Sequence, residues 1–226
     1  KHFQYFCMME AKVLKMLVPM ALDGLKATMG VFALTLVVSI PLSIWVAKLR
    51  ISKNKVISSI IGMYIYIMRG TPLLLQLMFI FFGYYRVPVI GYAFSREQAI
   101  FIAFILNYTA YFAEIFRGGI NSIDVGQYEA AQVLGLSKAH TFIRIILPQV
   151  IKNVMPSVGN EVITLVKDTS LIYILGASDI LKAAKSVSNA YAAFTPYIYI
   201  GFLYLIITAV LTKILSKVEN RYNYYR

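Results

Sequence analysis

Residues 127–148, Gln-Tyr-Glu-Ala-Ala-Gln-Val-Leu-Gly-Leu-Ser-Lys-Ala-His-Thr-Phe-Ile-Arg-Ile-Ile-Leu-Pro, form a polar insert between strongly apolar parts of the chain. Ala130 and Ala131 favour a helix, whereas Gly135 readily adopts the left-handed conformation that ends one. Ser137 can then cap a second short helix. We therefore expect a rigid helix–turn–helix hairpin outside the bilayer, on which another protein docks.

The composition is that of a polytopic membrane protein. Of the 226 residues, 59% are hydrophobic and 14% are charged, a balance too apolar for a soluble domain. A hydrocarbon core about 30 Å thick requires roughly 20 helical residues per crossing. We predict an all-α fold with about five transmembrane helices, in a single transmembrane domain over residues 1–226.

The charged and metal-binding residue types exclude two other classes of protein. The net charge of +12 is spread over loops between apolar runs, which argues against a nucleic-acid surface and fits retention on one membrane face. One cysteine, Cys7, and two histidines, His2 and His140, make an internal disulfide and a Cys/His metal site implausible. We expect no metal site and no catalytic residue.

Apolar runs and breaks place the expected elements. The five spans are expected over residues 27–47, 56–85, 98–116, 152–175 and 190–212. Residues 1–24 are expected either to lie on the membrane surface or to pack against the spans. The second span is interrupted at Arg69-Gly70-Thr71-Pro72, a break that requires burial in protein or a cavity. Basic residues favour an external N-terminus and a cytoplasmic C-terminus.

The hairpin pattern resembles the cytoplasmic coupling loop of permease subunits in ABC importers. Its fixed positions are Glu129, Ala130, Ala131, Gly135, Ile145, Leu147 and Pro148. Further motifs look like those of permeases for polar amino acids: Gly24 with Thr28, Arg69-Gly70-Thr71-Pro72-Leu73, Ala113-Glu114, Arg117-Gly118-Gly119 and Lys167-Asp168-Thr169-Ser170-Leu171. The resemblance implies a five-span, multi-pass permease of the bacterial inner membrane that imports a polar amino acid or a close relative such as cystine.

The resemblance also implies partners. These are an ATP-binding cassette ATPase on the cytoplasmic side, an extracellular or periplasmic substrate-binding protein, and a second permease copy or a close paralogue. Within a coupling loop over 118–148, the ATPase is expected to contact Glu129, Ala130, Ala131, Gly135, Leu147 and Pro148. The sequence has no G-x-x-x-x-G-K-[ST] loop. ATP is therefore expected on the partner, and no cofactor or ATPase site on this chain.

Polar residues inside the predicted spans are the candidates for substrate contact. Three pairs are separated by seven positions and are expected to share a helix face: Arg69 with Gln76, Asn107 with Glu114, and Glu161 with Asp168. Charges at this depth cost at least a few kcal/mol each unless they are paired or hydrated. The expected substrate-binding residues are Glu161, Asp168, Thr164, Thr169, Ser170, Asn107, Thr71 and Arg69.

Each candidate has an expected role. Glu161 or Asp168 would meet the α-ammonium group of the substrate, and Asn107 its side chain. Hydroxyl and backbone N–H groups near the helix breaks would meet the α-carboxylate, the hydroxyls being those of Thr71, Thr169 and Ser170. Alternatively, the charges neutralise each other inside the bundle, as Arg69 with Glu161 or Asp168 with Lys167.

Two other functions remain as alternatives. A self-sufficient secondary transporter or channel would not explain the hairpin, and five spans do not divide into two equal inverted repeats. An intramembrane enzyme would need a nucleophile and a base at membrane depth, but the histidines and the cysteine lie outside the expected spans. Besides Glu161 and Asp168, only Glu114 offers an acid there, so a neutral polar amino acid or cystine is favoured. Glu114 and Arg117 are expected to fix the hairpin to its span.

Overall fold

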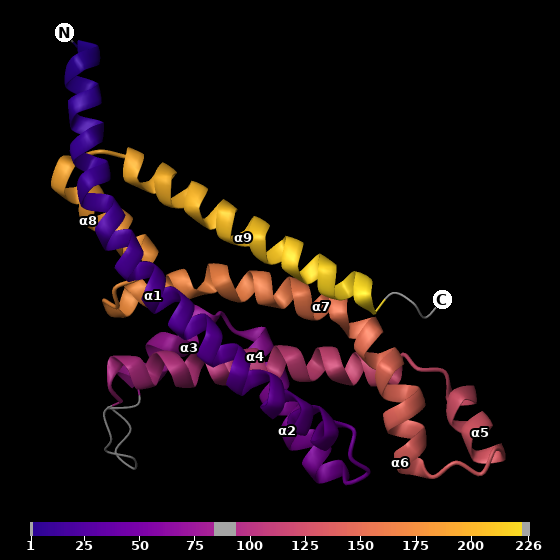
Figure 1. Cartoon of the computed structure of the whole chain (residues 1–226). Helices are drawn as coiled ribbons and strands as arrows, with labels where there is room; N and C mark the ends of the chain where they lie inside the picture. The colour runs from indigo at the N-terminus through magenta and orange to yellow at the C-terminus, as the bar shows by residue number, and fades with distance from the viewer. Residues whose placement is uncertain (1, 84–93, 223–226) are drawn as a thin grey trace. The chain divides into compact units, whose positions relative to one another are not determined.

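The computed structural model describes residues 2–83 and 94–222, which form helices and contain no strand. In chain order (Figure 1) they are α1 (His2–Arg50), α2 (Lys55–Gly70), α3 (Leu73–Met78), η1 (Phe79–Gly83), α4 (Arg96–Asn121), α5 (Val125–Val133), α6 (Lys138–Thr141), η3 (Phe142–Ile146), α7 (Leu147–Asp168), η4 (Thr169–Leu175), α8 (Ile180–Tyr191) and α9 (Thr195–Arg221). The predicted all-α fold is confirmed for the described residues.

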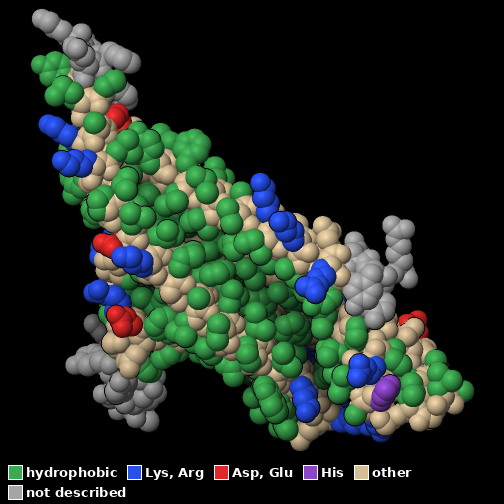
Figure 2. Space-filling model, in the orientation of Figure 1, with side chains coloured by type: hydrophobic (Ala, Val, Ile, Leu, Met, Phe, Trp, Pro, Cys, Tyr) green, Lys and Arg blue, Asp and Glu red, His purple; other side chains and the backbone are tan. Residues whose placement is uncertain are grey.

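Several of these helices are long and apolar enough to cross a membrane. Three qualify on their own: Cys7–Arg50 of α1, the whole of α4 and the whole of α9. A fourth span is obtained if Lys55–Gly70 and Leu73–Gly83, which are bent by 105° at their junction, count as one. Much of the visible surface is hydrophobic (Figure 2). The chain is therefore a polytopic membrane protein, as predicted.

Helix α7 and the 3₁₀ turn η4 occupy the region expected to be the fourth span. Among the described helices, α7 is not one of those that are long and apolar enough to cross a membrane. It carries four charged residues, Lys152, Glu161, Lys167 and Asp168, along 22 positions. Its polar middle makes this segment unlike the other spans in composition.

The chain divides into two compact units. Unit 1 takes residues up to Thr35, Leu74–Ala103 and Ile163–Leu211, and unit 2 takes Leu36–Leu73, Phe104–Val162 and the residues from Thr212 onward. The boundaries fall inside helices, so five helices contribute residues to both units: α1, α3, α4, α7 and α9.

Unit 1 is built around the first half of α1. Residues 2–24 form no separate element, because the helix is continuous from His2 to Arg50. One buried cluster joins α1, α8 and α9: Val13, Leu17, Ala21, Ile180, Ala183, Ala184, Val187 and Ile200. Tyr199 Oη also donates a hydrogen bond to Glu10 Oε2 (2.8 Å). One face of the N-terminal segment, from Val13 to Ala21, thus packs against α8 and α9 in unit 1.

Unit 2 joins the end of α1 to α2 and α4. Its first buried cluster consists of Ala47, Ile65, Ala110 and Ala113. The Tyr64 hydroxyl donates to the Leu106 carbonyl oxygen (2.6 Å), and Ser39 Oγ donates to that of Ile105 (3.4 Å). A second cluster joins the end of α4 to η3 and α7, and consists of Ile123, Ile146, Val150 and Val154.

The second half of helix α1 buries one stripe of small side chains. The stripe consists of Gly24, Thr28, Thr35, Ser39, Ser43 and Ala47. These positions are three to four residues apart or multiples of that spacing, so they lie on one face of the helix. Small side chains allow close approach of helices in a membrane, where burial in lipid alone provides little drive for association.

Candidate functional site: the hairpin and the helices that hold it

The first arm of the hairpin is α5, which is capped at both ends. Asp124 Oδ1 accepts a hydrogen bond from the Gly126 N–H (2.6 Å) at its start. At its end, the Leu136 N–H donates to the Ala131 carbonyl oxygen and the Gly135 N–H to that of Gln132, both at 3.0 Å. This pair of bonds is a Schellman motif, which needs a left-handed residue at Gly135. Its φ of 71° confirms the predicted conformation.

The second arm begins at Ser137 and continues into α7. Ser137 Oγ accepts a hydrogen bond from the His140 N–H (3.3 Å), which confirms the predicted cap. The short α6 is followed directly by the π turn η3 and then by α7. A proline in a helix lacks its N–H and clashes with the carbonyl group four residues earlier. For Pro148 that residue is Arg144, which lies in the wider π turn.

The segment over residues 118–148, expected to be a loop, is therefore mostly helical. Helix α4 extends to Asn121, so only a few residues separate it from α5. Figure 1 shows α5 folded back beside α6, and Gln149 Nε2 donates to Gln127 Oε1 (3.4 Å) between the two arms. The hairpin is a compact projection whose second arm and α7 form one uninterrupted helical path.

The hairpin exposes apolar side chains. Val133 and Leu134 are 87% and 74% exposed. A hollow of about 580 Å³ lies on the hairpin and is lined by Tyr128, Gln132, Leu136, Lys138, Thr141 and Phe142. Apolar exposure of this kind marks a protein or membrane contact surface.

The six residues expected to contact the ATPase differ in accessibility. Glu129, Ala130 and Gly135 are exposed, whereas Leu147 and Pro148 are half-buried. Ala131 is buried within the hairpin, so its small side chain packs the hairpin itself instead of lying on the outer surface.

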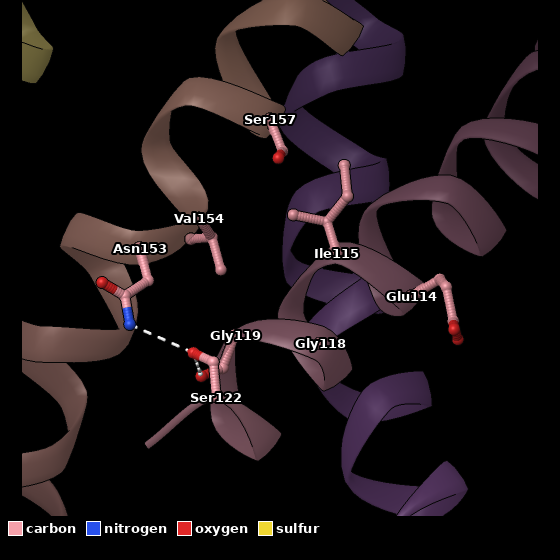
Figure 3. A pocket seen from close by; sticks show the side chains of 8 residues that line it. All are labelled: Glu114, Ile115, Gly118, Gly119, Ser122, Asn153, Val154 and Ser157. Atoms are coloured by element: carbon pink, nitrogen blue, oxygen red, sulfur yellow. Dashed lines mark hydrogen bonds between the residues drawn. The ribbon is translucent and has the colours of Figure 1, made fainter. Parts of the chain in front are cut away.

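A pocket of about 430 Å³ lies where the last turns of α4 meet the first turns of α7 (Figure 3). Asn153 Nδ2 of α7 donates to Ser122 Oγ (3.0 Å), which in turn donates to the Gly119 carbonyl oxygen (2.8 Å). A Cβ on Gly119 would clash with Val154 Cγ1. Glycine at this position therefore allows α4 and α7 to approach closely at the base of the hairpin.

Glu114 and Arg117 form an ion pair within α4. Arg117 Nε donates to Glu114 Oε2 (2.9 Å) and Nη2 to Oε1 (2.6 Å). Such bidentate pairing fixes both side chains more firmly than a single contact would. This contact occupies both carboxylate oxygens one to two turns before the end of α4. It lies within α4, and a role of the pair in fixing the hairpin to its span stays a prediction.

The predicted substrate residues of unit 2 gather partly at the bend after α2. Thr71 Oγ1 donates to the Ile67 carbonyl oxygen (2.8 Å), and the buried Asn107 donates from Nδ2 to that of Met68 (3.0 Å). The Arg69 guanidinium lies over the Tyr111 ring, 5.3 Å from its centroid. Glu161 belongs to the same unit, on α7.

The remaining candidates belong to unit 1. Thr164 and Asp168 lie in α7, and Thr169 and Ser170 in η4. Thr169 is fully buried and its Oγ1 donates to the Val166 carbonyl oxygen (2.7 Å). Contact of any of these residues with a substrate stays a prediction.

One of the three predicted face-sharing pairs is wrong. Arg69 and Gln76 lie on opposite sides of the 105° bend, in α2 and α3. Pro72 has no N–H group with which to continue the hydrogen bonding of α2. Residues seven positions apart across this break therefore do not share a helix face. Asn107 with Glu114, and Glu161 with Asp168, each lie within one continuous helix.

Residues 39–224 match the family described as "Binding-protein-dependent transport system inner membrane component". The chain belongs to this family. It is thus the membrane component, or permease, of a transport system that works with a binding protein, as the resemblance implied. Members of this class rely on a partner that carries the ATPase site.

Individual relatives agree with this assignment. The permease is 34% identical to the Bacillus subtilis arginine transport system permease protein ArtQ over 205 residues, which are 90% of this chain and 93% of ArtQ. It is 34% identical to a putative glutamine transport system permease protein GlnP of Rickettsia bellii over 220 residues, 97% of this chain and 98% of that protein.

One solved structure is similar to this chain in both fold and sequence. It is a crystal structure of an amino acid ABC transporter with histidines, at 34% identity and a TM-score of 0.82. The match covers 90% of the permease and 94% of that chain.

Proposed function

We propose that this permease is the membrane subunit of an ATP-driven importer that moves a polar amino acid into the cell. The observation that carries the proposal is the hairpin over residues 127–148, closed by a left-handed glycine and exposing apolar side chains. A projection of this kind provides a docking site for a separate protein that supplies the energy for transport. The amino acid transport named for the relatives supports the substrate class.

The partners follow from this arrangement. A separate ATPase docks on the hairpin at the cytoplasmic face, and a substrate-binding protein docks at the opposite face. The N-terminus is external and the C-terminus cytoplasmic. A second copy of this chain or a paralogue completes the pathway, because one set of about five spans provides half of a symmetric pore. ATP binds to the partner ATPase, and this chain contributes no ATPase site.

Helix α7 connects the hairpin to the substrate path. Glu161, Thr164 and Asp168 lie on one face of α7, and Glu161 is about 20 Å from Pro148 along the helix axis at 1.5 Å per residue. An ATPase that binds one conformation of the hairpin more tightly shifts the population of conformations of α7. In this proposal, Glu161 or Asp168 neutralises the α-ammonium group of the substrate.

Reconstitution tests the function. The permease, its ATPase and its binding protein are incorporated into liposomes, and uptake of radiolabelled polar amino acids is measured with and without ATP on the ATPase side. We expect uptake that requires both ATP and the ATPase that docks on the hairpin. Accumulation by liposomes containing the permease alone, driven by a proton or sodium gradient, would instead show a secondary transporter.

Charge-removing variants test the α7 residues. Glu161→Gln and Asp168→Asn keep the size of the side chain but remove its charge. A hydrogen bond to a charged group contributes about 1.5 to 3 kcal/mol, so substrate-stimulated ATPase activity should require roughly tenfold to hundredfold more substrate. Basal ATPase activity should persist. Glu219→Gln, at an exposed acid of α9, is the matched control, and normal transport by both α7 variants would exclude the pair from the path.

A further inference from the structure

A pocket of about 390 Å³ in unit 2 lies between the end of α1, α2 and α4. Its charged lining residues are Arg50, Arg69 and Glu114. The hairpin and the acids of α7 do not line it, so the function proposed above leaves this pocket without a role.

Arg50 is held in a fixed position along α2. Its Nη1 donates to Ser58 Oγ (2.7 Å), and Ser58 Oγ donates to the Arg50 carbonyl oxygen (2.7 Å). An ideal Cβ on Gly62 would lie 3.2 Å from Arg50 Cζ, so the guanidinium rests in a slot that a larger residue would narrow. The fixed guanidinium is ready to accept a ligand without further loss of side-chain freedom.

Arg69 supplies the second cation of the pocket. Its guanidinium carbon lies over the Tyr111 ring, 5.3 Å from the ring centroid, where the face of the ring attracts a cation. Glu114 is engaged by Arg117 through both carboxylate oxygens. Within the described part of the chain, no carboxylate forms a salt bridge with Arg50 or Arg69. The pocket therefore holds an excess of positive charge.

The surroundings of the pocket are apolar and exposed. Tyr66 lines the pocket and is 78% exposed. Other exposed apolar side chains on the same helix are Ile60, Met63 and Ile67. Near the end of α1, Lys48 lies over the exposed ring of Trp45 (5.5 Å). A tryptophan beside a lysine at the end of an apolar helix is typical of the membrane interface.

We propose that the Arg50–Arg69 pocket binds the phosphate of an anionic phospholipid headgroup. Guanidinium groups match phosphate oxygens with paired hydrogen bonds, and unpaired charges beside an apolar membrane surface are costly. Basic pockets between membrane helices bind anionic headgroups in this way. The acyl chains would lie along the exposed apolar side chains of α2. In this proposal Arg69 contacts lipid, in place of the substrate contact expected from the sequence.

Native mass spectrometry of the full-length permease, purified with its ATPase, tests the site. The complex is titrated with phosphatidylglycerol or phosphatidylcholine, and bound lipid is counted for wild type and for Arg50→Gln/Arg69→Gln. The wild type should retain phosphatidylglycerol in preference to phosphatidylcholine. The double variant should bind phosphatidylglycerol at least about tenfold more weakly, because charge-assisted bonds are lost. Lys53→Gln/Lys55→Gln, at exposed basic residues of the same turn, should bind like wild type.

Two results would overturn the proposal. One is equal retention of phosphatidylglycerol by the wild type and the Arg50/Arg69 variant. The other concerns thermal stability in nanodiscs. If inorganic phosphate added to phosphatidylcholine nanodiscs stabilised the permease as much as phosphatidylglycerol does, a soluble anion would be the ligand. If the double variant does not assemble, Arg69→Gln alone provides the test, and Arg69→Lys should recover part of the binding.

Discussion

The backbone of Gly24 touches that of Asp179: an ideal Cβ on Gly24 would lie 2.5 Å from the Asp179 carbonyl carbon. Asp179 is itself buried and caps α8, accepting hydrogen bonds from the N–H groups of Leu181 (3.1 Å) and Lys182 (2.9 Å). Helix α1 and the start of α8 are thus joined backbone to backbone within unit 1.

Adding one methyl group at this contact should destabilise the permease. The obstacle to Gly24→Ala is backbone, which cannot rotate away, so we expect a loss of about 1 to 3 kcal/mol. Thermal unfolding in detergent measures the effect. Gly30→Ala is the control, because Gly30 is on the same helix and has no atom within 4 Å of its ideal Cβ. Equal melting temperatures for the two variants would contradict the close contact.

Asp179 should make stability depend on pH. Burial raises the pKa of its carboxyl group above the ordinary value of 3.8. Between that value and the raised pKa, the folded protein binds more protons than the unfolded chain, so stability falls as pH rises through this window. Asp179→Asn can still cap α8 but does not titrate. We therefore expect the free energy of unfolding of Asp179→Asn, relative to that of wild type, to increase from acidic to neutral pH. If the free energies of unfolding of the two proteins changed in parallel with pH, burial would not raise the pKa of Asp179.

The contact between Gly119 and Val154 predicts a suppressor. Gly119→Ala should destabilise the permease and lower ATPase stimulation, because its methyl group would overlap Val154 Cγ1. Val154→Ala in the same chain removes that group and should restore part of both properties. The neighbouring Gly118→Ala is the control, since nothing lies within 4 Å of its ideal Cβ. Additive losses in the double variant would exclude a direct contact.

Two ion pairs of equal spacing should differ in strength. Glu114 and Arg117 are 25% and 31% exposed, whereas Asp23 and Lys26 are 75% and 80% exposed. Exposed pairs gain little because water screens them. A double-mutant cycle on thermal stability should give a coupling of about 1 kcal/mol for Glu114–Arg117 and nearly zero for Asp23–Lys26. Equal couplings would show that burial and bidentate geometry add nothing here.

The left-handed turn of the hairpin gives the last prediction. Gly135→Val places a β-branched residue at a φ of 71°, at a cost of at least about 1 to 2 kcal/mol. It should abolish substrate-stimulated ATPase activity while membrane insertion continues. Gly135→Asn is the matched control, because asparagine tolerates this conformation, and it should keep most of the activity. Activity of the valine variant equal to wild type would show that the turn does not set the docking geometry.

Local chemistry explains why the hairpin and the α2 break could be predicted. Gly135, Ser137 and Pro72 act on the backbone within a few residues of their own position, so their effects can be read from the chain directly. The family resemblance relied on the same local positions.

Features set by distant contacts could not be predicted in this way. The Arg69–Gln76 pairing failed because periodicity assumes an unbroken helix. The slot for Arg50 and the close approach at Gly119 need atoms from other helices, and a single sequence does not place them. Glycine in a helix, as at positions 24, 62 and 119, is the one signal that could have drawn attention to these contacts.

The π turn at residues 142–146 joins the hairpin to α7 without a loop. A π turn holds about one residue more than an α turn, so its conversion to an α turn would shift the helical register by one position. One position corresponds to roughly 100° of rotation and 1.5 Å of translation. Such a conversion would therefore couple a small axial displacement of the second arm of the hairpin to a large rotation of the helix that carries Glu161.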